Sequence, residues 1–425
     1  MERLPGFRDF YPHPLPHQDV WSAAARNHLF ERWRSVAHAY GFQEYDGPPL
    51  EPLELFTTKS GEEIVDQLYC FEDKGRRSVA LRPEMTPTLA RMVAVHERNY
   101  KKPIKWFAIP QLFRYERQQK GRLREHFQLN ADIVGEADPA SDAELIALLI
   151  DTLRSLGLTS DDFVVRLSSR QAWQRYFAEH CQDEARAYEF YQVIDKLERE
   201  DPAVSETKLQ ALGFSLDAVR AFIDAGKPTP ELQLVIENLT ARGLAGFARI
   251  DYNVIRGLAY YTGVVFEAFD QKGEFRAIAG GGRYDGLIKL ISGGKTDLPA
   301  IGFGMGDVVL LELLQKRNLL PGFDSKLEVF CIIEDEARRA DTLRLIQLLR
   351  DAGISVDFPM VPMKPDKQFK RALESKARFT VRAELTAEGL LQARFKNLET
   401  RVEEVTSPES LATAIVRVLR GNPTV

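Results

Sequence analysis

The 425-residue sequence predicts an α+β protein with a helical insertion and a separate α/β domain at its C-terminal end. Three observations predict this fold class. Short strand candidates bounded by turn or charge signals occur between residues 77 and 168 and again between 247 and 287. Residues 171–246 hold helix candidates separated by Gly and Pro, without a strand candidate. After a Pro-Gly linker at 317–326, β-α-β alternation begins.

The predicted elements follow from hydrophobic periodicity along the chain. Apolar residues at helical spacing from Trp21 to Tyr40 predict a helix that ends at Gly41. A second helix is expected at 141–156, and four short helices are expected in the insertion. The final segment predicts a strand, a long helix, a strand, a basic helix and two more strands. The strand candidates before it are 77–83, 105–116, 126–136, 163–168, 247–257, 262–270 and 275–287.

The composition is that of an ordinary globular protein, with 44% hydrophobic and 28% charged residues. Cys70, Cys181 and Cys331 are far apart in sequence, which predicts reduced thiols in a cytoplasmic protein. No apolar stretch reaches the ~20 residues that span a bilayer, so we expect no membrane segment. The net charge of −5 argues against a general nucleic-acid coat but allows a local basic patch.

Positive charge is concentrated in FRYERQQKGRLREHFQL, a strand–loop–strand candidate at 113–129. Its cations are Arg114, Arg117, Lys120, Arg122 and Arg124. A solvated charge run is one interpretation. The closely flanking apolar residues and the excess of arginine, whose planar guanidinium suits bidentate phosphate contacts, favour a polyphosphate-binding loop.

A carboxylate and a hydroxyl, Glu84 and Thr86, lie two residues apart in LRPEMTPTLARM. On an extended segment they share one face, where together they can hold an ammonium group. A helix capped at Thr86 explains the same residues equally well. Further along, Arg256 precedes the tyrosines Tyr260 and Tyr261 in a strand-like context, where aromatic residues pack more often than they bind ligands.

Two glycine-rich segments follow. The three glycines at 280–282 do not fit the GxGxxG pattern and predict a close approach of the backbone to a ligand or a helix. PAIGFGMGDVVLLELL predicts a glycine-rich turn that enters a helix, where glycines including Gly304 and Gly306 let backbone N–H groups meet an anion. The turn contains no Lys or Arg, so a tight turn packed against a sheet is the alternative.

A basic helix is predicted in the final domain at KPDKQFKRALESKAR, with Lys367, Lys370 and Arg371 on neighbouring positions. Like charges at this spacing destabilise a helix mildly unless a partner binds them. Phosphates are one such partner, and an ordinary solvated face is the other interpretation.

These segments, in this order, resemble the histidyl-tRNA synthetases, a family of class II aminoacyl-tRNA synthetases, over nearly the whole chain. GFQEYDGPPLEP is similar to motif 1, with Pro48 at its proline, and 113–129 is similar to motif 2. RGLAYYTGVVFE and AGGGRYDGL resemble the two histidine-specific segments, and GFGMGDVVLLELL resembles motif 3. The resemblance implies an antiparallel class II catalytic sheet flanked by helices.

The resemblance also implies a domain organisation. Residues 1–170 would form the first part of the catalytic domain, with motifs 1 and 2, and 171–246 the helical insertion. Residues 247–320 would complete the catalytic domain with the histidine-specific segments and motif 3. Residues 326–425 resemble the anticodon-binding domain.

Each candidate residue receives a role from the resemblance. The implied histidine-binding residues are Glu84, Thr86, Gln128, Asp132, Arg256, Tyr260 and Tyr261, with Asp132 in place of the usual Glu that accepts the imidazole N–H. The implied ATP-binding residues are Arg114, Glu116, Arg122, His126, Gly304 and Gly306. Arg114 and Arg256 are the implied catalytic residues, facing the α-phosphate. The tRNA-binding residues would be Lys367, Lys370 and Arg371, and no metal ligands are assigned.

Three positions depart from the pattern of the family. His126 stands where an aromatic residue, commonly Phe, lies beneath the adenine, and Phe127 is one place further on. Ala259 stands where an acidic residue is common. Val309 stands where the motif 3 arginine contacts the γ-phosphate, so Arg122 or Mg²⁺ is expected to neutralise that phosphate instead.

The function that the resemblance implies is that of a histidine–tRNA ligase. It uses ATP with Mg²⁺ to form histidyl-adenylate and transfers the histidyl group to tRNA(His), as a cytoplasmic homodimer without a membrane partner. The alternative is a catalytically silent paralogue, such as the regulatory subunit of ATP phosphoribosyltransferase in histidine biosynthesis, which typically lacks the C-terminal domain. The acidic balance and the pocket residues disfavour a general RNA-binding module.

Overall fold

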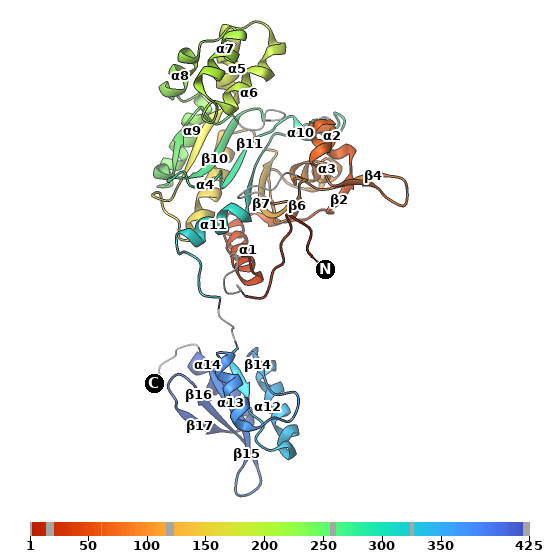
Figure 1. The fold of residues 1–425 in the computed structure, drawn as a ribbon, viewed down its shortest axis with the longest axis vertical. Coiled ribbons are helices and arrows are strands. Elements are labelled where there is room, and N and C mark those ends of the chain that lie inside the picture. Colours follow the sequence, from red (N-terminus) through yellow and green to blue (C-terminus); the bar gives the residue numbers. More distant parts are fainter. Residues whose placement is uncertain are drawn as a thin grey trace. The chain divides into compact units, whose positions relative to one another are not determined.

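The computed structural model describes residues 2–13, 21–60, 62–115, 123–255, 261–323 and 327–419. It divides into two compact units, Met1–Pro321 and Gly322–Val425 (Figure 1). Both units combine helices with a sheet, as the predicted α+β class requires. Among the described helices, none is both long and apolar enough to cross a membrane.

A mixed sheet of nine described strands forms the centre of the first unit, in the order β1-β5-β7-β12-β11-β10-β8-β9 (Figure 1). Strand β6 pairs with the start of β7. The pairings from β5 through to β8 are antiparallel, whereas β1 and β9 join the two edges in parallel. The bounds are β1 Gln43–Glu44, β5 Ile104–Ala108, β6 Gln111–Phe113, β7 Glu125–Val134, β8 Phe163–Ser169, β9 Ala248–Ile250, β10 Val264–Asp270, β11 Ala279–Arg283 and β12 Ala300–Gly306.

Three helices pack on one face of this sheet: α1 (Ala23–Ala39), α4 (Pro139–Arg154) and α11 (Asp307–Lys316). Ser22 and Asp138 cap the first two, because their side chains accept hydrogen bonds from backbone N–H groups of the first turn. Phe127 of β7 packs edge-on against Phe30 of α1, with ring centroids 5.2 Å apart. Since side chains alternate along a strand, the neighbours of Phe127 face the other side of the sheet.

A smaller layer lies beside the main sheet. It holds a three-stranded sheet in the order β2-β4-β3, with α2, a 3-10 helix, α3 and α10. Leu89 and Val93 of α3 pack with Tyr284 and Ile288 in a buried cluster that also includes Trp106 of β5. The bounds are β2 Leu50–Pro52, α2 Glu54–Ser60, the 3-10 helix Glu62–Gln67, β3 Cys70–Glu72, β4 Ser78–Leu81, α3 Thr86–His96 and α10 Leu287–Ile291.

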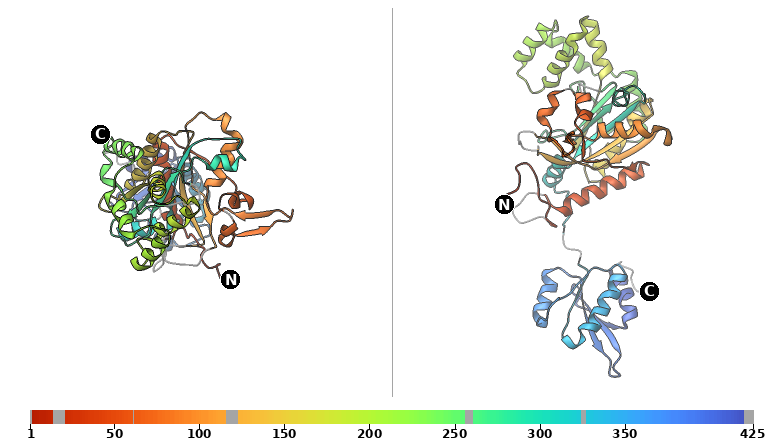
Figure 2. Two further views of the ribbon diagram at one scale, coloured as in Figure 1. Left: turned by 90° about the horizontal axis from the view of Figure 1, so that it is seen from above. Right: turned by 90° about the vertical axis from the view of Figure 1, so that its right-hand side faces the viewer.

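The helical insertion contains five α-helices rather than the predicted four. The additional helix, α5 (Arg170–His180), begins directly at the end of β8, where Ser169 caps it. Trp173 and Phe177 of α5 pack with Phe190 and Phe214 in an aromatic core that excludes water. As Figure 1 and Figure 2 show, the helices of residues 170–225 gather at one end of the first unit, whereas the helix of residues 230–241 packs against α4 beside the main sheet. The others are α6 Ala187–Lys196, α7 Pro202–Ala211, α8 Leu216–Ala225 and α9 Pro230–Ala241.

The second unit has a five-stranded sheet, counted over its described residues, in the order β14-β13-β15-β16-β17. Strand β13 pairs in parallel with both β14 and β15, which are reached through helices, and the remaining pairings are antiparallel. Strand β17 and helix α14 were not in the sequence prediction. The bounds are β13 Val329–Cys331, α12 Arg339–Asp351, β14 Val356–Asp357, α13 Pro365–Glu374, β15 Phe379–Leu385, β16 Leu391–Asn397, β17 Glu403–Thr406 and α14 Pro408–Leu419.

Candidate active site

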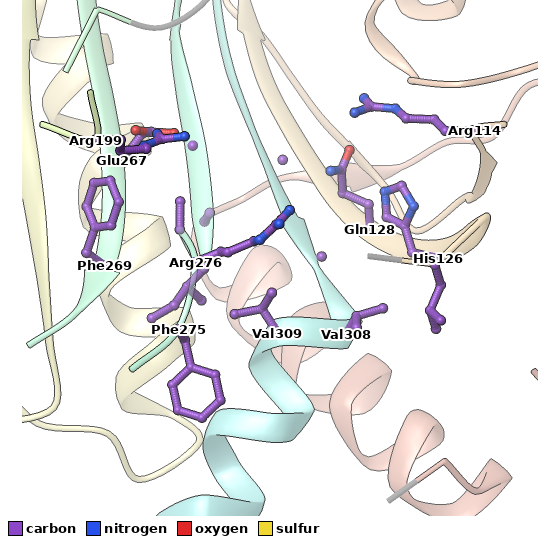
Figure 3. A pocket seen from close by; sticks show the side chains of 17 residues that line it. Arg114, His126, Gln128, Arg199, Glu267, Phe269, Phe275, Arg276, Val308 and Val309 are labelled. Atoms are coloured by element: carbon purple, nitrogen blue, oxygen red, sulfur yellow. The ribbon is translucent and has the colours of Figure 1, made fainter. Parts of the chain in front are cut away.

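A cavity of about 780 Å³ lies on the face of the main sheet opposite Phe127. Its walls come from β7, β10, β12 and the start of α11, together with the connection between β10 and β11. Figure 3 shows the side chains that point into it. The polar and charged residues of its lining are Arg114, His126, Gln128, Arg199, Glu267 and Arg276.

Alternation along β7 brings the predicted ATP and histidine residues to one face. His126 and Gln128 line the cavity, and Asp132 follows Gln128 by four residues on the same side of the strand. The pairing with β12 sets Asp132 opposite Gly302 and Gln128 opposite Gly306. One strand therefore carries side chains assigned to both substrates in a single row.

The glycines of PAIGFGMGDVV lie in strand β12, not in the turn that we predicted. A Cβ atom on Gly302 would overlap Oδ1 of Asp132, and one on Gly304 would come within 2.7 Å of the Gln128 side chain. The glycines therefore leave room for polar side chains of the neighbouring strand. Gly304 and Gly306 also line the cavity.

Asp132 is buried, and its Oδ1 accepts a hydrogen bond of 2.5 Å from the hydroxyl of Tyr284. Burial raises the pKa of the Asp132 carboxyl to about 7, although the bond from Tyr284 opposes the shift. Tyr261 is half-buried, and a Cβ atom on Gly282 would lie 3.1 Å from its ring. Because Gly282 pairs with Gly302, which pairs with Asp132, this ring lies near the row of Asp132.

His126, and not Phe127, faces the cavity. Phe127 packs between Phe10 and Phe30 on the helix-covered face. Burial, followed by the positive charges of Arg114 and Arg8, lowers the pKa of the His126 imidazole to about 3. The imidazole is therefore neutral at neutral pH.

Arg114 follows β6 and connects the cavity to the segment of Glu84. Its Nε donates a hydrogen bond of 3.1 Å to the carbonyl oxygen of Pro83. Glu84 and Thr86 are half-buried at the start of α3. Neither sequence interpretation of this segment holds as stated. The segment is not extended at Thr86, which begins α3, and Thr86 does not cap the helix, because Met85 occupies the N-cap without a side-chain hydrogen bond. Through this bond, Arg114 is held next to the backbone segment that carries Glu84 and Thr86.

Four implied residues, Glu116, Arg122, Arg256 and Tyr260, lie outside the described residues. The basic residues of α13 belong to the second unit and are exposed. Lys370 forms an ion pair of 3.7 Å with Glu374, and Arg371 one of 3.2 Å with Asp357. Lys367 is exposed on the same helix.

Several residues that shape the site were not predicted from the sequence. Arg8 is buried behind β7, where its guanidinium donates to Glu125 at 2.7 Å and to Asp307 at 2.9 Å. Burial raises the pKa of the Asp307 carboxyl, and Arg8 opposes that shift. Asp307 also accepts a hydrogen bond from the backbone N–H of Phe127. These bonds join the N-terminal segment to the start of α11. No local sequence pattern around Arg8 predicts them.

Arg199, Glu267 and Arg276 were also missed, because each is a single charged residue without a local motif. They come from the α6–α7 connection, from β10 and from the β10–β11 connection, and meet only at the cavity. Within the described residues, no cluster of three or more His, Cys, Asp or Glu side chains can hold a metal ion.

Comparisons with known proteins agree with this geometry. The histidyl-tRNA synthetase family model matches residues 19–307. A histidine–tRNA ligase of Opitutus terrae is 46% identical over 402 residues, which cover 89% of this chain and 90% of the relative.

Two solved structures share the fold. A histidyl-tRNA synthetase from Nostoc sp. PCC 7120 matches with a TM-score of 0.79 and 24% identity, over 98% of this chain and 99% of the other. An ATP phosphoribosyltransferase regulatory subunit/histidyl-tRNA synthetase from Bacillus halodurans C matches with a TM-score of 0.71 and 22% identity, over 90% and 97% of the two chains. Fold alone therefore does not separate an active synthetase from a regulatory paralogue.

Proposed function

Because this chain belongs to the histidyl-tRNA synthetase family, we propose that it is a histidine–tRNA ligase that uses ATP to activate histidine. In the first step a carboxylate oxygen of histidine attacks the α-phosphorus of ATP, and pyrophosphate leaves. In the second step a ribose hydroxyl at the 3′ end of tRNA(His) attacks the activated carbonyl, and AMP leaves. Both steps need positioned reactants and neutralised charge more than covalent help from the protein.

The observation that carries the proposal is the shared face of β7. Gln128 and Asp132 lie on the strand that also presents His126, and Gly302 and Gly304 open the space beside them. Asp132 accepts an N–H of the imidazole, while Tyr261 meets the other ring nitrogen. Two hydrogen bonds to the imidazole reject side chains without ring nitrogens, because the buried Asp132 would then keep only its bond from Tyr284 and lose the second one.

The other assigned residues divide the remaining tasks. Glu84, Thr86 and Gln128 hold the α-ammonium group of histidine. Arg114 neutralises the α-phosphate, which it can approach because its Nε is fixed on the carbonyl of Pro83. The neutral ring of His126 stacks on the adenine. Glu116, Arg122, Arg256 and Tyr260 keep the roles that the family pattern gives them.

Mg²⁺ enters as the partner of the ATP phosphates rather than as a resident ion. Glu267 is the only carboxylate among the described residues that line the cavity. One carboxylate together with phosphate oxygens and water is a typical magnesium environment in phosphate-binding sites. Bound in this way, Mg²⁺ would supply charge neutralisation to the pyrophosphate that leaves.

The second unit supports ligase activity over the regulatory alternative. A regulatory subunit has little need of a separate α/β domain with a basic, exposed helix such as α13, whereas a ligase uses one to bind tRNA. We propose that Lys367, Lys370 and Arg371 contact the tRNA backbone. We further propose a cytoplasmic homodimer formed through the motif 1 segment.

Histidine-dependent exchange of labelled pyrophosphate into ATP tests the proposal. We expect exchange with histidine and none when histidine is omitted or replaced by phenylalanine, which has no ring nitrogen. Folded protein that shows no exchange at saturating ATP and histidine would contradict ligase activity. Activation of phenylalanine at a comparable rate would contradict the roles of Asp132 and Tyr261.

A further inference from the structure

One wall of the cavity contains none of the residues assigned to histidine or to the α-phosphate. It consists of the β10–β11 connection, residues 271–278, and the first turn of α11. Arg276 and Phe275 line the cavity from the connection, and Val308 and Val309 line it from the helix. The described side chains of α11 that face the cavity are thus apolar, and the positive charge on this wall comes from Arg276.

The Arg276 side chain points inward, although it is exposed. In Figure 3 it extends from the connection toward the middle of the cavity, while Arg114 extends toward the middle from the opposite side. Arg199, from the α6–α7 connection, lines the same cavity near Glu267. Arg276 and Arg199 are thus two exposed arginines that line the cavity away from Arg114. Their two charges suit an anion with more than one charged group.

The connection that carries Arg276 is held firmly. Arg317, at the C-terminal end of α11, forms ion pairs of 2.6 Å with Asp270 and 3.1 Å with Glu274. The carboxylate of Asp270 also accepts the backbone N–H of Glu274 at 2.8 Å. These contacts fix the backbone two residues before Arg276, so its guanidinium reaches the cavity from a defined position.

The start of α11 places no negative charge next to the cavity. Asp307 is the acidic residue of its first turn, and its carboxylate is bonded to Arg8 and to the backbone of Phe127 on the other face of the sheet. The helix N-terminus next to the cavity therefore presents Gly306 and two valines rather than a negative charge. A helix N-terminus adds a favourable potential for a nearby anion.

We propose that Arg276, assisted by Arg199, binds the β- and γ-phosphates of ATP and the pyrophosphate that leaves. The inference rests on the proposed function. His126 and Arg114 receive the adenine and the α-phosphate, and Gln128 to Asp132 receive histidine. Among the described lining residues, Arg276 and Arg199 are the cations left for the outer phosphates, beside the shares assigned to Arg122 and Mg²⁺. A guanidinium there can contact two phosphate oxygens at once, which suits a polyphosphate better than a point charge does. It supplies the charge that Val309 cannot supply.

The test compares Arg276→Ala and Arg276→Lys with Lys272→Ala, a matched control that removes an exposed charge from the same connection. For Arg276→Ala we expect the KM values of ATP and of pyrophosphate in the exchange reaction to rise roughly 10- to 100-fold. The KM of histidine and the inhibition constant of AMP, which has no outer phosphates, should stay unchanged. Arg276→Lys should restore part of the loss, and Lys272→Ala should match the wild type.

Calorimetric titration with MgATP and with AMP separates this inference from the proposed function. The wild type should bind MgATP more tightly than AMP, and Arg276→Ala should lose that preference. A loss of preference in a protein without exchange activity would support the phosphate site while contradicting the ligase. Equal weakening of ATP and AMP binding, or no change in either, would overturn the role of Arg276.

Discussion

Both faces of β7 carry polar side chains, but the two faces differ in what these side chains contact. On the helix-covered face, Glu125 is buried and paired with Arg8, which also pairs with Asp307. On the cavity face, Gln128 and Asp132 pack beside glycines of β12, and His126 and Gln128 line a space large enough for substrates, while Asp132 is buried further along the same row. Charges on the first face are compensated within the protein. Polar groups on the second face are left in positions where a bound ligand can form hydrogen bonds with them.

The difference shows why the two faces respond to mutation differently. Removing one partner of a buried ion pair leaves an uncompensated charge in a low-dielectric interior, which destabilises the fold strongly. Changing a residue on the cavity face alters the shape or charge offered to the substrates while much of the core stays packed. Stability measurements and kinetic measurements should therefore separate the faces.

The largest effect on stability is expected for Arg8→Met. The substitution keeps most of the side-chain volume but leaves Glu125 and Asp307 as buried carboxylates without their cation. We expect the free energy of unfolding in a denaturant titration to fall by about 3–5 kcal/mol. Arg3→Met is the control, since Arg3 pairs only with exposed Asp9 at 3.3 Å in the described structure and should change stability by less than about 0.5 kcal/mol. Similar small losses in both variants would contradict the pairing on this face.

On the cavity face the largest effect is expected for Gly302→Ala. The added Cβ atom overlaps Asp132, so this carboxylate must leave its position. We expect a loss on the order of 100-fold in kcat/KM for histidine, together with a stability loss of about 1–3 kcal/mol. Gly246→Ala is the control, because a Cβ atom there has no neighbour within 4 Å. A Gly302→Ala enzyme with the wild-type KM for histidine would contradict the position of Asp132.

A smaller and pH-dependent effect is expected for Asp132→Asn. In the folded protein the pKa of Asp132 is raised to about 7 from 3.8, so the native state retains a proton that the unfolded chain has lost. The contribution of Asp132 to stability is therefore largest below pH 4 and declines as the pH rises toward 7. The Asn variant lacks this decline, so its stability relative to the wild type should increase between pH 4 and 8.

The same variant tests recognition of histidine. The ionised carboxylate accepts an imidazole N–H more strongly than an amide oxygen does, so we expect the KM of histidine to rise roughly tenfold at pH 8. The rise should shrink toward pH 6, where Asp132 is mostly protonated in the wild type. A ratio of the two KM values that is independent of pH would contradict ionisation of Asp132 in this range.

Prediction from sequence succeeded where a pattern is local. The helix predicted at 141–156 forms at Pro139–Arg154, because Asp138 and Pro139 supply a start signal and apolar residues repeat at helical spacing. It failed at α5, whose apolar residues are few and adjacent to polar ones, and at 247–257, where Ala248–Ile250 is the only strand within the described residues 247–255. The predicted glycine-rich turn at Gly302 to Gly306 is a central strand, since a glycine's role depends on the strands beside it.

By itself, the sequence determined the α+β class, most of the elements and the family to which the chain belongs, because motifs and periodicity are properties of neighbouring residues. The tertiary structure alone decided that Phe127 packs with Phe10 and Phe30 on the helix-covered face of the sheet, because strand register selects the face. It also decided that Arg8 pairs with Asp307, although almost the whole sequence of the first unit lies between them, and that Arg276 shares a cavity with Arg114. Such contacts join residues far apart in sequence, and only the packed sheet brings them together.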